Sequence, residues 1–502
     1  MKRTGLRILA GIGTILALLI IVVVARTAMI EPPATTDGAL PPALSAEATT
    51  AAAAHLSAAI RLPTVSWQRG ATGDKVEASH KAFVDFRDFI AATYPSFAKA
   101  TTRDIVSDYS LLFTWKGSDD TLAPVLFMSH MDVVPVVPGT EAQWKQNPFG
   151  GVIVDGVIWG RGAIDCKASL IAMLEAADAL IAKGYTPKRT IMFALGHDEE
   201  VSGLTGNRKI AEMLKARGQK LAFVSDEGGM VTSGVVGGID RPVALIGIAE
   251  KGYMTLALTT HSPGGHSSMP PAAGTSAVGR LVRAMDAVEQ TPFDSGLDPV
   301  NRAMLKAMAP AVSYGRRMVF ANLWLFGPVV VSSMSSDPRT GAALHTTIAP
   351  TMLKAGIKEN VLPPEAEGII NFRLHQRDTI ESATAHVRDA IGDPEVDVTT
   401  LEGARNASAV SDPDGEAFKL LSGTIHARFP DALVVPNLTV AATDSRHYLP
   451  LTDNVFRFVP LALNASELAA FHTTNERVPV ASLAGAVGFY TKIMQNLDDP
   501  QL

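Results

Sequence analysis

Four short groups of polar residues carry side chains that bind metals or move protons. They are His130 with Asp132, Asp165, Glu199 with Glu200, and Asp226 with Glu227. Imidazole nitrogen and carboxylate oxygen are good ligands for zinc, manganese or cobalt, and a catalytic zinc keeps one position open for water or substrate. The chain has one cysteine, Cys166, so a site built from thiolates is excluded. The pattern predicts a metal site dominated by carboxylates.

Three of these groups follow short apolar runs that are typical of strands buried on both faces. The runs are Pro124 to Met128, Thr190 to Leu195 and Leu221 to Val224. Open α/β sheets bind ligands beyond the carboxyl ends of their strands, which is where these polar groups fall. Between the strands, Lys81 to Ala92 and Lys167 to Lys183 carry apolar residues at helical spacing. This alternation predicts βαβ units and an α/β fold with a mostly parallel sheet.

The polar groups also occur in a recognisable order along the chain. A His-x-Asp at His130, a Gly-Arg-Gly-x-x-Asp ending at Asp165, the pair Glu199-Glu200 and a late His472 follow one another. From about residue 50 to the C-terminus the chain resembles metallopeptidase family 20, a family of metal-dependent amidohydrolases. The segment Thr443–Tyr448 and the apolar N-terminus are most similar to its branch of carboxypeptidase S and the N-fatty-acyl amino acid synthase/hydrolase.

The resemblance implies a site with two divalent metal ions, with zinc expected and manganese or cobalt as alternatives. It implies that Asp165 bridges the two ions. His130 and Asp226 would be the further ligands of one metal ion, while Glu200 and His472 would be the further ligands of the other. Because Glu227 is adjacent to Asp226 and equally able to coordinate, the choice between these two carboxylates stays open.

Two carboxylates are expected to act in catalysis rather than as ligands. Glu199 is predicted to be the general base, which takes a proton from water and delivers it to the leaving nitrogen. Asp132 is predicted to accept a hydrogen bond from the His130 imidazole and so to fix its tautomer. Adjacent residues point in different directions, so Glu199 can face the water while Glu200 binds metal.

A second module is expected after Gly252. Its predicted elements are strand 254–259, helix 276–288, strands 346–353 and 368–374, helix 380–391 and strand 396–401. This βαββαβ order resembles the family's inserted ferredoxin-like α+β lid, often used for dimerisation. The resemblance implies that His266 stabilises the oxyanion, and that Asn360 and Arg373 hold the substrate's carbonyl and carboxylate. An arginine fork suits a carboxylate because it can bind both oxygens.

The N-terminus predicts a membrane anchor. Lys2, Arg3 and Arg7 precede the uncharged run 8–25, which as a helix would cover roughly 27 Å, close to the thickness of the hydrocarbon core. The basic flank is expected to stay cytoplasmic, with the catalytic domain outside, which is the periplasm in a bacterium. The alternative is a cleaved signal peptide and a secreted enzyme.

The resulting division is an anchor at 1–28, an Ala/Pro-rich tether at 29–55, catalytic segments at 56–252 and 404–502, and a lid at 253–403. The formal charge of −6 gives no reason to expect nucleic acid. An apolar stretch within 290–340, with Trp324 at its centre, is expected to pack within the lid. The alternative is a channel for a long acyl chain or an apolar peptide residue.

The predicted function is a membrane-anchored, two-metal amidohydrolase or carboxypeptidase that releases a C-terminal amino acid from short peptides or N-acyl amino acids. A homodimer formed through the lid is the expected partner arrangement. The alternatives are an N-fatty-acyl amino acid hydrolase/synthase and a catalytically inactive, anchored binding protein.

Overall fold

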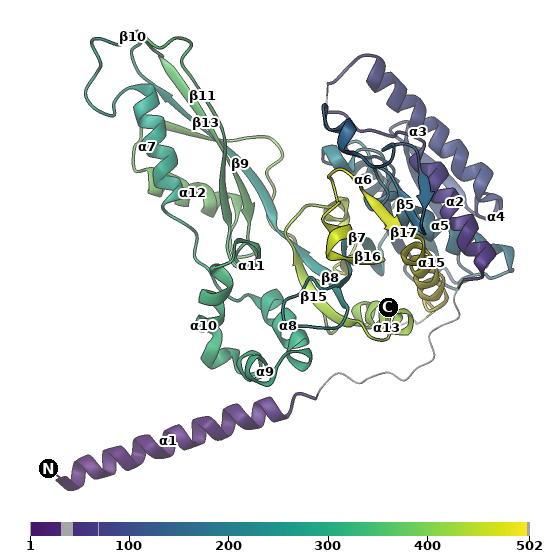
Figure 1. Cartoon of the computed structure of the whole chain (residues 1–502), viewed down its shortest axis with the longest axis horizontal. Coiled ribbons are helices and arrows are strands. Elements are labelled where there is room, and N and C mark those ends of the chain that lie inside the picture. The colour runs from purple at the N-terminus through teal and green to yellow at the C-terminus, as the bar shows by residue number, and fades with distance from the viewer. Residues whose placement is uncertain (1, 32–43, 69, 499–501) are drawn as a thin grey trace.

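The computed structural model describes residues 2–31, 44–68, 70–498 and 502. Its largest element is an eight-stranded sheet in the order β1-β2-β6-β3-β7-β16-β8-β15 (Figure 1). These strands are β1 Thr102–Val106, β2 Ser110–Trp115, β3 Val125–His130, β6 Ile191–Gly196, β7 Phe223–Ser233, β8 Val243–Glu250, β15 Leu433–Thr439 and β16 Val455–Asn464. The three apolar runs that the sequence marked as strands are β3, β6 and β7.

The sheet is mixed, not mostly parallel as expected. The central strands β6, β3, β7 and β16 run parallel, as do β8 and β15. Strands β1 and β2 are antiparallel additions at one edge, and β8 runs antiparallel to β16. The parallel strands at the centre position the polar groups, as expected. The prediction was wrong for the strands on either side of this centre, where antiparallel pairs occur.

Helices cover both faces of this sheet, because its central strands are apolar on both sides. Along β3, Val125 and Phe127 belong to one buried cluster with α5 and α15, whereas Leu126 and Met128 belong to another with α6. The helices of this body are α2 Ala46–Ile60, α3 Asp74–Thr93, α4 Pro95–Ala100, α5 Lys167–Ala182, α6 Asn207–Ala216, α13 Glu416–Arg428, α14 Ala465–Leu468 and α15 Val480–Gln495. A small sheet of β4 Val152–Val154, β5 Val157–Trp159 and β17 Arg477–Pro479 adjoins them.

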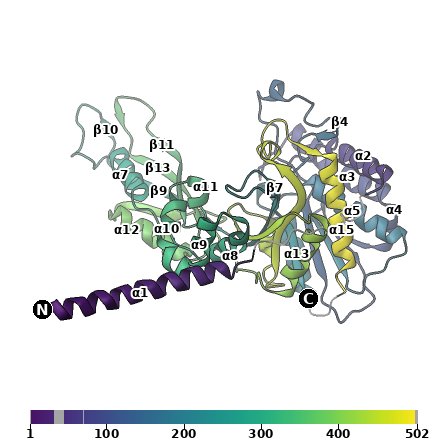
Figure 2. The same cartoon turned by 60° about the horizontal axis from the view of Figure 1, so that its bottom comes forward.

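A second, four-stranded sheet stands beside this body (Figures 1 and 2). Its order is β11-β13-β9-β14 and its pairs are antiparallel. The elements are β9 Gly252–His261, α7 Ala277–Glu289, β11 Thr347–Ala355, β13 Glu365–Leu374, α12 Ile380–Ile391 and β14 Val396–Thr400. They occur in the expected βαββαβ order. At the far end, β10 Gly265–His266 pairs with β12 Val361–Leu362.

Between α7 and β11 the chain forms four further helices. They are α8 Pro299–Met308, α9 Tyr314–Ala321, α10 Leu323–Ser335 and α11 Pro338–Gly341. Helix α8 packs on β15 of the large sheet, and Met304 and Met308 lie against Val435 there. This stretch therefore packs partly on the catalytic body, whereas the sequence predicted packing within the lid.

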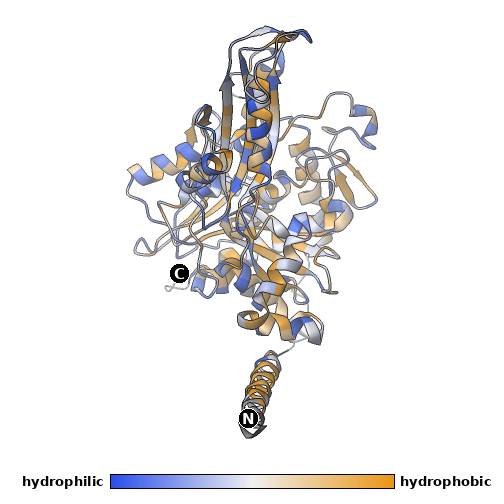
Figure 3. Ribbon diagram, turned by 90° about the vertical axis from the view of Figure 1, so that its left-hand side faces the viewer, coloured by the Kyte–Doolittle hydropathy of each residue, from blue (hydrophilic) through white to orange (hydrophobic). Residues whose placement is uncertain are grey.

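The N-terminal helix α1, Lys2–Ala28, projects away from the body, and Figure 3 shows that it is hydrophobic over most of its length. Its segment Leu9–Ala28 is long and apolar enough to cross a membrane, and a signal sequence would have the same character. Residues 32–43 of the predicted tether lie outside the described residues. The end of the predicted tether is helical, because α2 begins at Ala46 and buries Ala52 and Ala53 in the core.

Candidate metal centre

The polar groups gather at the carboxyl ends of the central parallel strands, as the sequence predicted. His130 is the last residue of β3, and Glu199 opens a single 3-10 turn shortly after β6. Glu227 lies within β7, and Asp165 comes just before α5. Residues separated by nearly a hundred positions thus meet because neighbouring parallel strands end at one edge.

Two groups of potential ligands share one carboxylate. In the first, His130 Nε2 lies 2.9 Å from Asp165 Oδ1 and 3.2 Å from Glu227 Oε2. In the second, His472 Nε2 lies 2.6 Å from Asp165 Oδ2 and 3.3 Å from Glu200 Oε2. Each oxygen of Asp165 therefore faces a different imidazole, which is the arrangement that a bridging carboxylate requires.

The donor set fits two divalent cations. The ligand atoms of each group lie within 4.8 Å of one another. The other oxygen of Glu200, Oε1, is buried and has no hydrogen-bond partner among the described residues. An unpaired carboxylate oxygen that is removed from water is unfavourable, and a cation is a suitable partner for it.

The two adjacent carboxylates of β7 have different surroundings. Glu227 reaches His130, whereas Asp226 Oδ2 accepts a hydrogen bond of 2.8 Å from the Ser445 backbone N–H. The geometry therefore favours Glu227, not the predicted Asp226, as the ligand beside His130. Asp226 is buried and adjacent to Glu227 in β7.

Asp132 positions the glutamate pair as well as the histidine. Its Oδ1 accepts a hydrogen bond from the Glu199 N–H at 3.2 Å, and its Oδ2 accepts one from the Glu200 N–H at 3.1 Å. His130 Nδ1 lies 2.9 Å from the backbone carbonyl of Asp132 and 3.3 Å from its Oδ1. The predicted contact with His130 is present, but the carbonyl is the nearer acceptor. Burial opposes ionisation of Asp132, yet His130 holds its pKa below the usual value.

Glu199 has the electrostatic environment of a proton carrier. Burial, and then repulsion from Glu227 and Asp444, raise the pKa of Glu199 well above its usual value. Burial also raises the pKa of Glu227, to about 8. Carboxylates whose pKa values are raised toward neutrality can both accept and return a proton, which is the property that general acid-base catalysis needs.

Glu476 is a buried residue beside the site that the sequence did not reveal. Its carboxylate is fully buried, with Oε1 accepting hydrogen bonds from the N–H groups of Ile164 and Asp165 and Oε2 accepting one from Gly162. Arg161 Nη1 completes the set at 2.6 Å from Oε2. Glu476 lies four residues after His472, so it joins the loop that carries Asp165 to the loop that carries His472.

The three substrate residues predicted in the lid do not come together within one chain. His266 and Asn360 are neighbours at the far end of the second sheet, where the Ser267 N–H donates to the Asn360 carbonyl at 3.1 Å. Arg373 lies near the opposite end of β13, a strand of ten residues that spans roughly 30 Å. Only Arg373 is therefore near the junction with the large sheet.

A second arginine, which the sequence did not reveal, accompanies Arg373. The guanidinium groups of Arg373 and Arg405 lie 5.1 and 5.2 Å from the centre of the Tyr253 ring. Burial, and then the nearby charges of Arg446 and Arg373, lower the pKa of Arg405 to about 10. Its Nε is buried without a hydrogen-bond partner among the described residues. Clustered cations with a buried, unpaired donor form a receptor for an anion.

Two carboxylate-imidazole groups that share one aspartate, beside a buried glutamate of raised pKa, define a metal-dependent hydrolase. The chain belongs to peptidase family M20/M25/M40, whose model matches residues 126–496. It is a hydrolase of the metallopeptidase or N-acyl amino acid hydrolase type, as the resemblance of its motifs implied.

The chain is similar to known proteins over most of its length. It is 38% identical over 465 residues to N-fatty-acyl-amino acid synthase/hydrolase PM20D1 of Mus musculus, covering 91% of this chain and 90% of that protein. It is 29% identical to carboxypeptidase S of Saccharomyces cerevisiae, covering 88% and 84% of the two chains. Among solved structures, an M20 family metallo-carboxypeptidase from Sulfolobus solfataricus shares its fold, with a TM-score of 0.63 at 15% identity and coverage of 90% and 99%.

We expect Glu476→Gln to lower metal affinity by about 10- to 100-fold, the usual effect of losing a group that orients metal ligands. The amide would present an NH₂ group to N–H donors, so the Asp165 and His472 loops would separate. Metal content after dialysis against a graded chelator measures this effect. Glu416→Gln, at an exposed carboxylate in α13, is the matched control. Unchanged metal retention in Glu476→Gln would contradict the role.

Metal binding is expected to release protons and to strengthen as the pH rises. Burial alone would lower the pKa of His130, but Glu227 and other carboxylates raise it well above its usual value. Hydrogen bonds to Asp165 and Glu200 raise the pKa of His472 to about 10. Both imidazoles therefore hold a proton at neutral pH in the metal-free protein, and a metal must displace it.

Titration calorimetry in two buffers of different ionisation enthalpy measures this proton release. We expect fewer protons to be released by His472→Gln than by the unaltered chain. A metal affinity that stays constant between about pH 6 and pH 8 would contradict the assignment of these imidazoles as ligands.

Proposed function

We propose that this chain is a membrane-anchored, two-metal amidohydrolase that cleaves the amide bond to a C-terminal amino acid in short peptides or N-acyl amino acids. The observation that supports this most directly is the pair of ligand groups sharing Asp165 beside the buried Glu199. The alternative is an N-fatty-acyl amino acid hydrolase/synthase, which the similarity to PM20D1 favours. A catalytically inactive binding protein is less well supported, because ligands, base and arginines are all present.

The proposed ligands are His130, Asp165 and Glu227 for one ion and Asp165, Glu200 and His472 for the other. Zinc is the proposed metal, with manganese and cobalt as alternatives. Bound there, two divalent cations would supply Lewis acidity to a water molecule and to the substrate carbonyl. Asp226 stays a candidate ligand if its hydrogen bond to Ser445 is given up.

Glu199 is the proposed catalytic base. It would take a proton from the attacking water and deliver it to the nitrogen of the departing amino acid, so one carboxyl group serves both halves of the reaction. Asp132 would hold Glu199 and Glu200 through their backbone N–H groups and would orient His130. The environment that raises the pKa of Glu199 would keep the transferred proton on the protein between the two steps.

The substrate's free carboxylate is proposed to bind at Arg373 and Arg405. Both guanidinium groups lie against Tyr253, and their repulsion would be relieved by an anion. This arrangement supports cleavage next to a C-terminal amino acid, since a carboxylate beyond the reacting amide would be held by a fork of donors.

The lid at 253–403 is proposed to mediate a homodimer. His266 and Asn360 lie at its far end, so their proposed role in stabilising the oxyanion and substrate carbonyl would be performed on the active site of a second copy. Asn360 Oδ1 is buried without a partner among the described residues. The mass of the purified chain in solution tests this assembly.

We further propose that α1 is an uncleaved anchor with the N-terminus in the cytoplasm and the catalytic body outside, with a cleaved signal as the alternative. The apolar run and the basic residues that precede it support this orientation. Protease protection of the catalytic body in sealed vesicles tests the orientation.

Glu199→Gln is expected to keep both metals and to lower turnover by about 10²- to 10⁴-fold, because it removes only proton transfer. The measurement is release of the amino acid from a glycyl-leucine-type dipeptide and from an N-oleoyl amino acid, with and without added zinc, manganese or cobalt. Glu200→Gln is the matched control and is expected to lose metal. Metal-dependent turnover that persists in Glu199→Gln would remove its assignment as the base.

Arg405→Met is expected to raise KM about tenfold or more for a substrate with a free carboxylate, as loss of a charge-assisted hydrogen bond implies. The same substrate as a carboxamide should be turned over equally by the variant and the unaltered chain. Arg103→Met, at an exposed arginine of β1, is the control. An equal loss on both substrates would assign Arg405 a structural role.

A further inference from the structure

Helices α9 and α10 form a hairpin within the second module, in which α10 is apolar and α9 carries Arg316 and Arg317. Their axes are bent by 114° at Asn322, and together they are long and apolar enough to pass for a broken membrane span. Separately they are 8 and 13 residues long, or roughly 12 and 20 Å, which is too short to cross a hydrocarbon core of about 30 Å. Helix α10 carries no charged residue. This hairpin is therefore suited to entering one leaflet rather than crossing both.

Part of the apolar surface of α10 is exposed, at Trp324, Leu325 and Val329, while its other large apolar side chains are half-buried or buried. Trp324 is 53% exposed and Val329 is 63% exposed, while Gly327 and Val330 are the buried residues of the helix. A charge-free helix that presents its large side chains outward is unusual on a water-facing surface. An environment other than water is therefore expected on that side.

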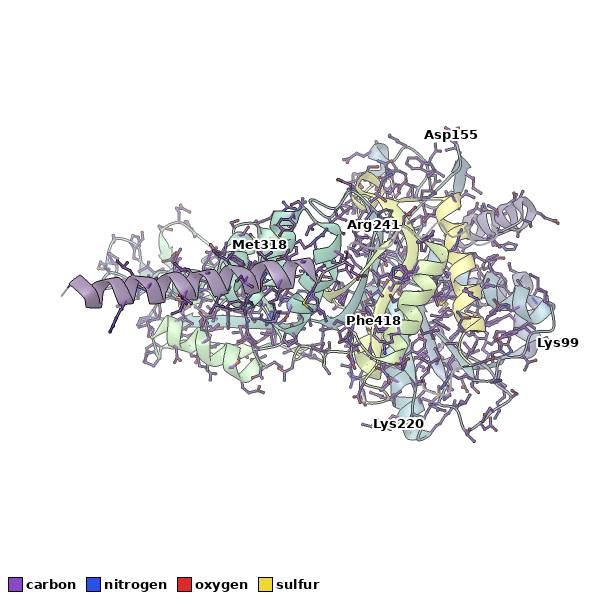
Figure 4. All side chains as sticks on the ribbon, turned by 90° about the horizontal axis from the view of Figure 1, so that it is seen from below. Lys99, Asp155, Lys220, Arg241, Met318 and Phe418 are labelled. Carbon is purple, nitrogen blue, oxygen red and sulfur yellow. The ribbon has the colours of Figure 1, made fainter. Side chains whose placement is uncertain are left out.

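The hairpin is joined to α1 by specific hydrogen bonds. Asn322 is fully buried between α9 and α10, and its Nδ2 donates to the Val23 carbonyl at 3.2 Å and to Thr27 Oγ1 at 3.4 Å. In return, Arg26 Nε donates to the Ala321 carbonyl at 3.2 Å. Figure 4 shows Met318, on α9, beside α1. The last turns of α1 are thus docked on the hairpin.

Among the residues of α1 whose side chains the structure describes, those before Val23 make no comparable contact. Val23 and Thr27 are its buried residues among those whose burial is described, and Leu9, Ile15 and Ile21 are more than half exposed. Figure 1 shows most of this helix pointing away from the catalytic body, with α9 beside its C-terminal end. If α1 crosses a membrane, its C-terminal end marks the outer interface, and the hairpin lies at that level.

We propose that the α9–α10 hairpin is a second membrane contact, in which the exposed face of α10 enters the outer leaflet beside α1. The proposal rests on α1 as the anchor of the proposed function. The occupant is the interfacial and upper acyl region of a phospholipid bilayer, where tryptophan is favoured. Two contacts would fix the orientation of the catalytic body against the membrane, which a single contact through α1 leaves open.

Tryptophan fluorescence of the full chain in phosphatidylcholine vesicles with brominated acyl chains tests this proposal. The chain has five tryptophans, and α1 contains none, so quenching by these lipids cannot come from the anchor itself. We expect quenching in the unaltered chain, loss of most of it in Trp324→Phe, and its retention in Trp67→Phe. No quenching, or quenching that Trp324→Phe leaves intact, overturns the proposal.

A pair of charged variants gives an independent readout. Val329→Lys should lose the quenching and should turn over vesicle-embedded N-oleoyl amino acid more slowly, with turnover of a soluble dipeptide retained. Ile105→Lys, at a 45% exposed residue of β1, is the matched control and should change neither. Identical behaviour of the two variants overturns the proposal, as does a concentration-dependent dimer in which α10 is covered by a second copy.

The same samples separate this proposal from the proposed function. Dipeptide or acyl amino acid turnover without Trp324-dependent quenching means that the enzyme assignment holds and the hairpin assignment fails. Trp324-dependent quenching without turnover of any tested substrate means that the hairpin assignment holds and the enzyme assignment fails.

Discussion

The site depends on one buried carboxylate that is not itself a metal ligand. Glu476 binds three backbone N–H groups of the loop that ends at Asp165, and Arg161 from that loop pairs with it in return. Arg161 also donates through Nη2 to the carbonyls of His472 and Thr473, at 3.4 and 3.3 Å. A buried ion pair is favourable only when its remaining polar atoms form hydrogen bonds, and here backbone N–H and carbonyl groups form most of them. The hydrogen bonds of this buried pair therefore hold Asp165 and His472 at a fixed distance from each other.

The contacts of Glu476 oppose a repulsion among the buried carboxylates of the site. Glu199, Glu200 and Glu227 all have raised pKa values, with burial as the first cause and neighbouring carboxylates adding to it. His472 has a left-handed backbone conformation at φ +57°, which is uncommon for a residue other than glycine. Strain and repulsion of this kind persist only where the surrounding structure over-determines the geometry. Two divalent cations would remove the repulsion, so the fold and the metals support the same arrangement.

The sequence predicted those parts of the site that local patterns encode. Strands β3, β6 and β7 were visible as apolar runs because they are buried on both faces, and the βαββαβ order of the second sheet followed from the periodicity of each segment. The mixed pairing of β8 with β16 was not visible, since it depends on contacts between residues two hundred positions apart. Composition suggested a tether where α2 begins, because alanine-rich segments are typical both of linkers and of buried helices.

The direction of individual side chains could not be predicted from the sequence either. Asp226 and Glu227 have equivalent chemistry in the sequence, and only the strand decides which of them faces His130. Glu476 and Arg405 looked like ordinary charged residues, because what gives them a role is their burial beside distant loops.

The insertion between α7 and β11 constrains how the second sheet can move. The chain passes from β8 into β9 near Lys251, whose Nζ donates to the carbonyls of Ala342 and His345 at 2.8 Å each. Helix α8 packs on β15, and His375 Nε2 of the second module lies 3.0 Å from Oδ2 of Asp298 at the N-terminus of this helix. The base of the second sheet is thus tied to the catalytic body at several points, while its far end, with His266, makes no such contact with the described residues of that body. These contacts hold Arg373 at the base, so a change in the position of the far end would leave the proposed carboxylate receptor in place.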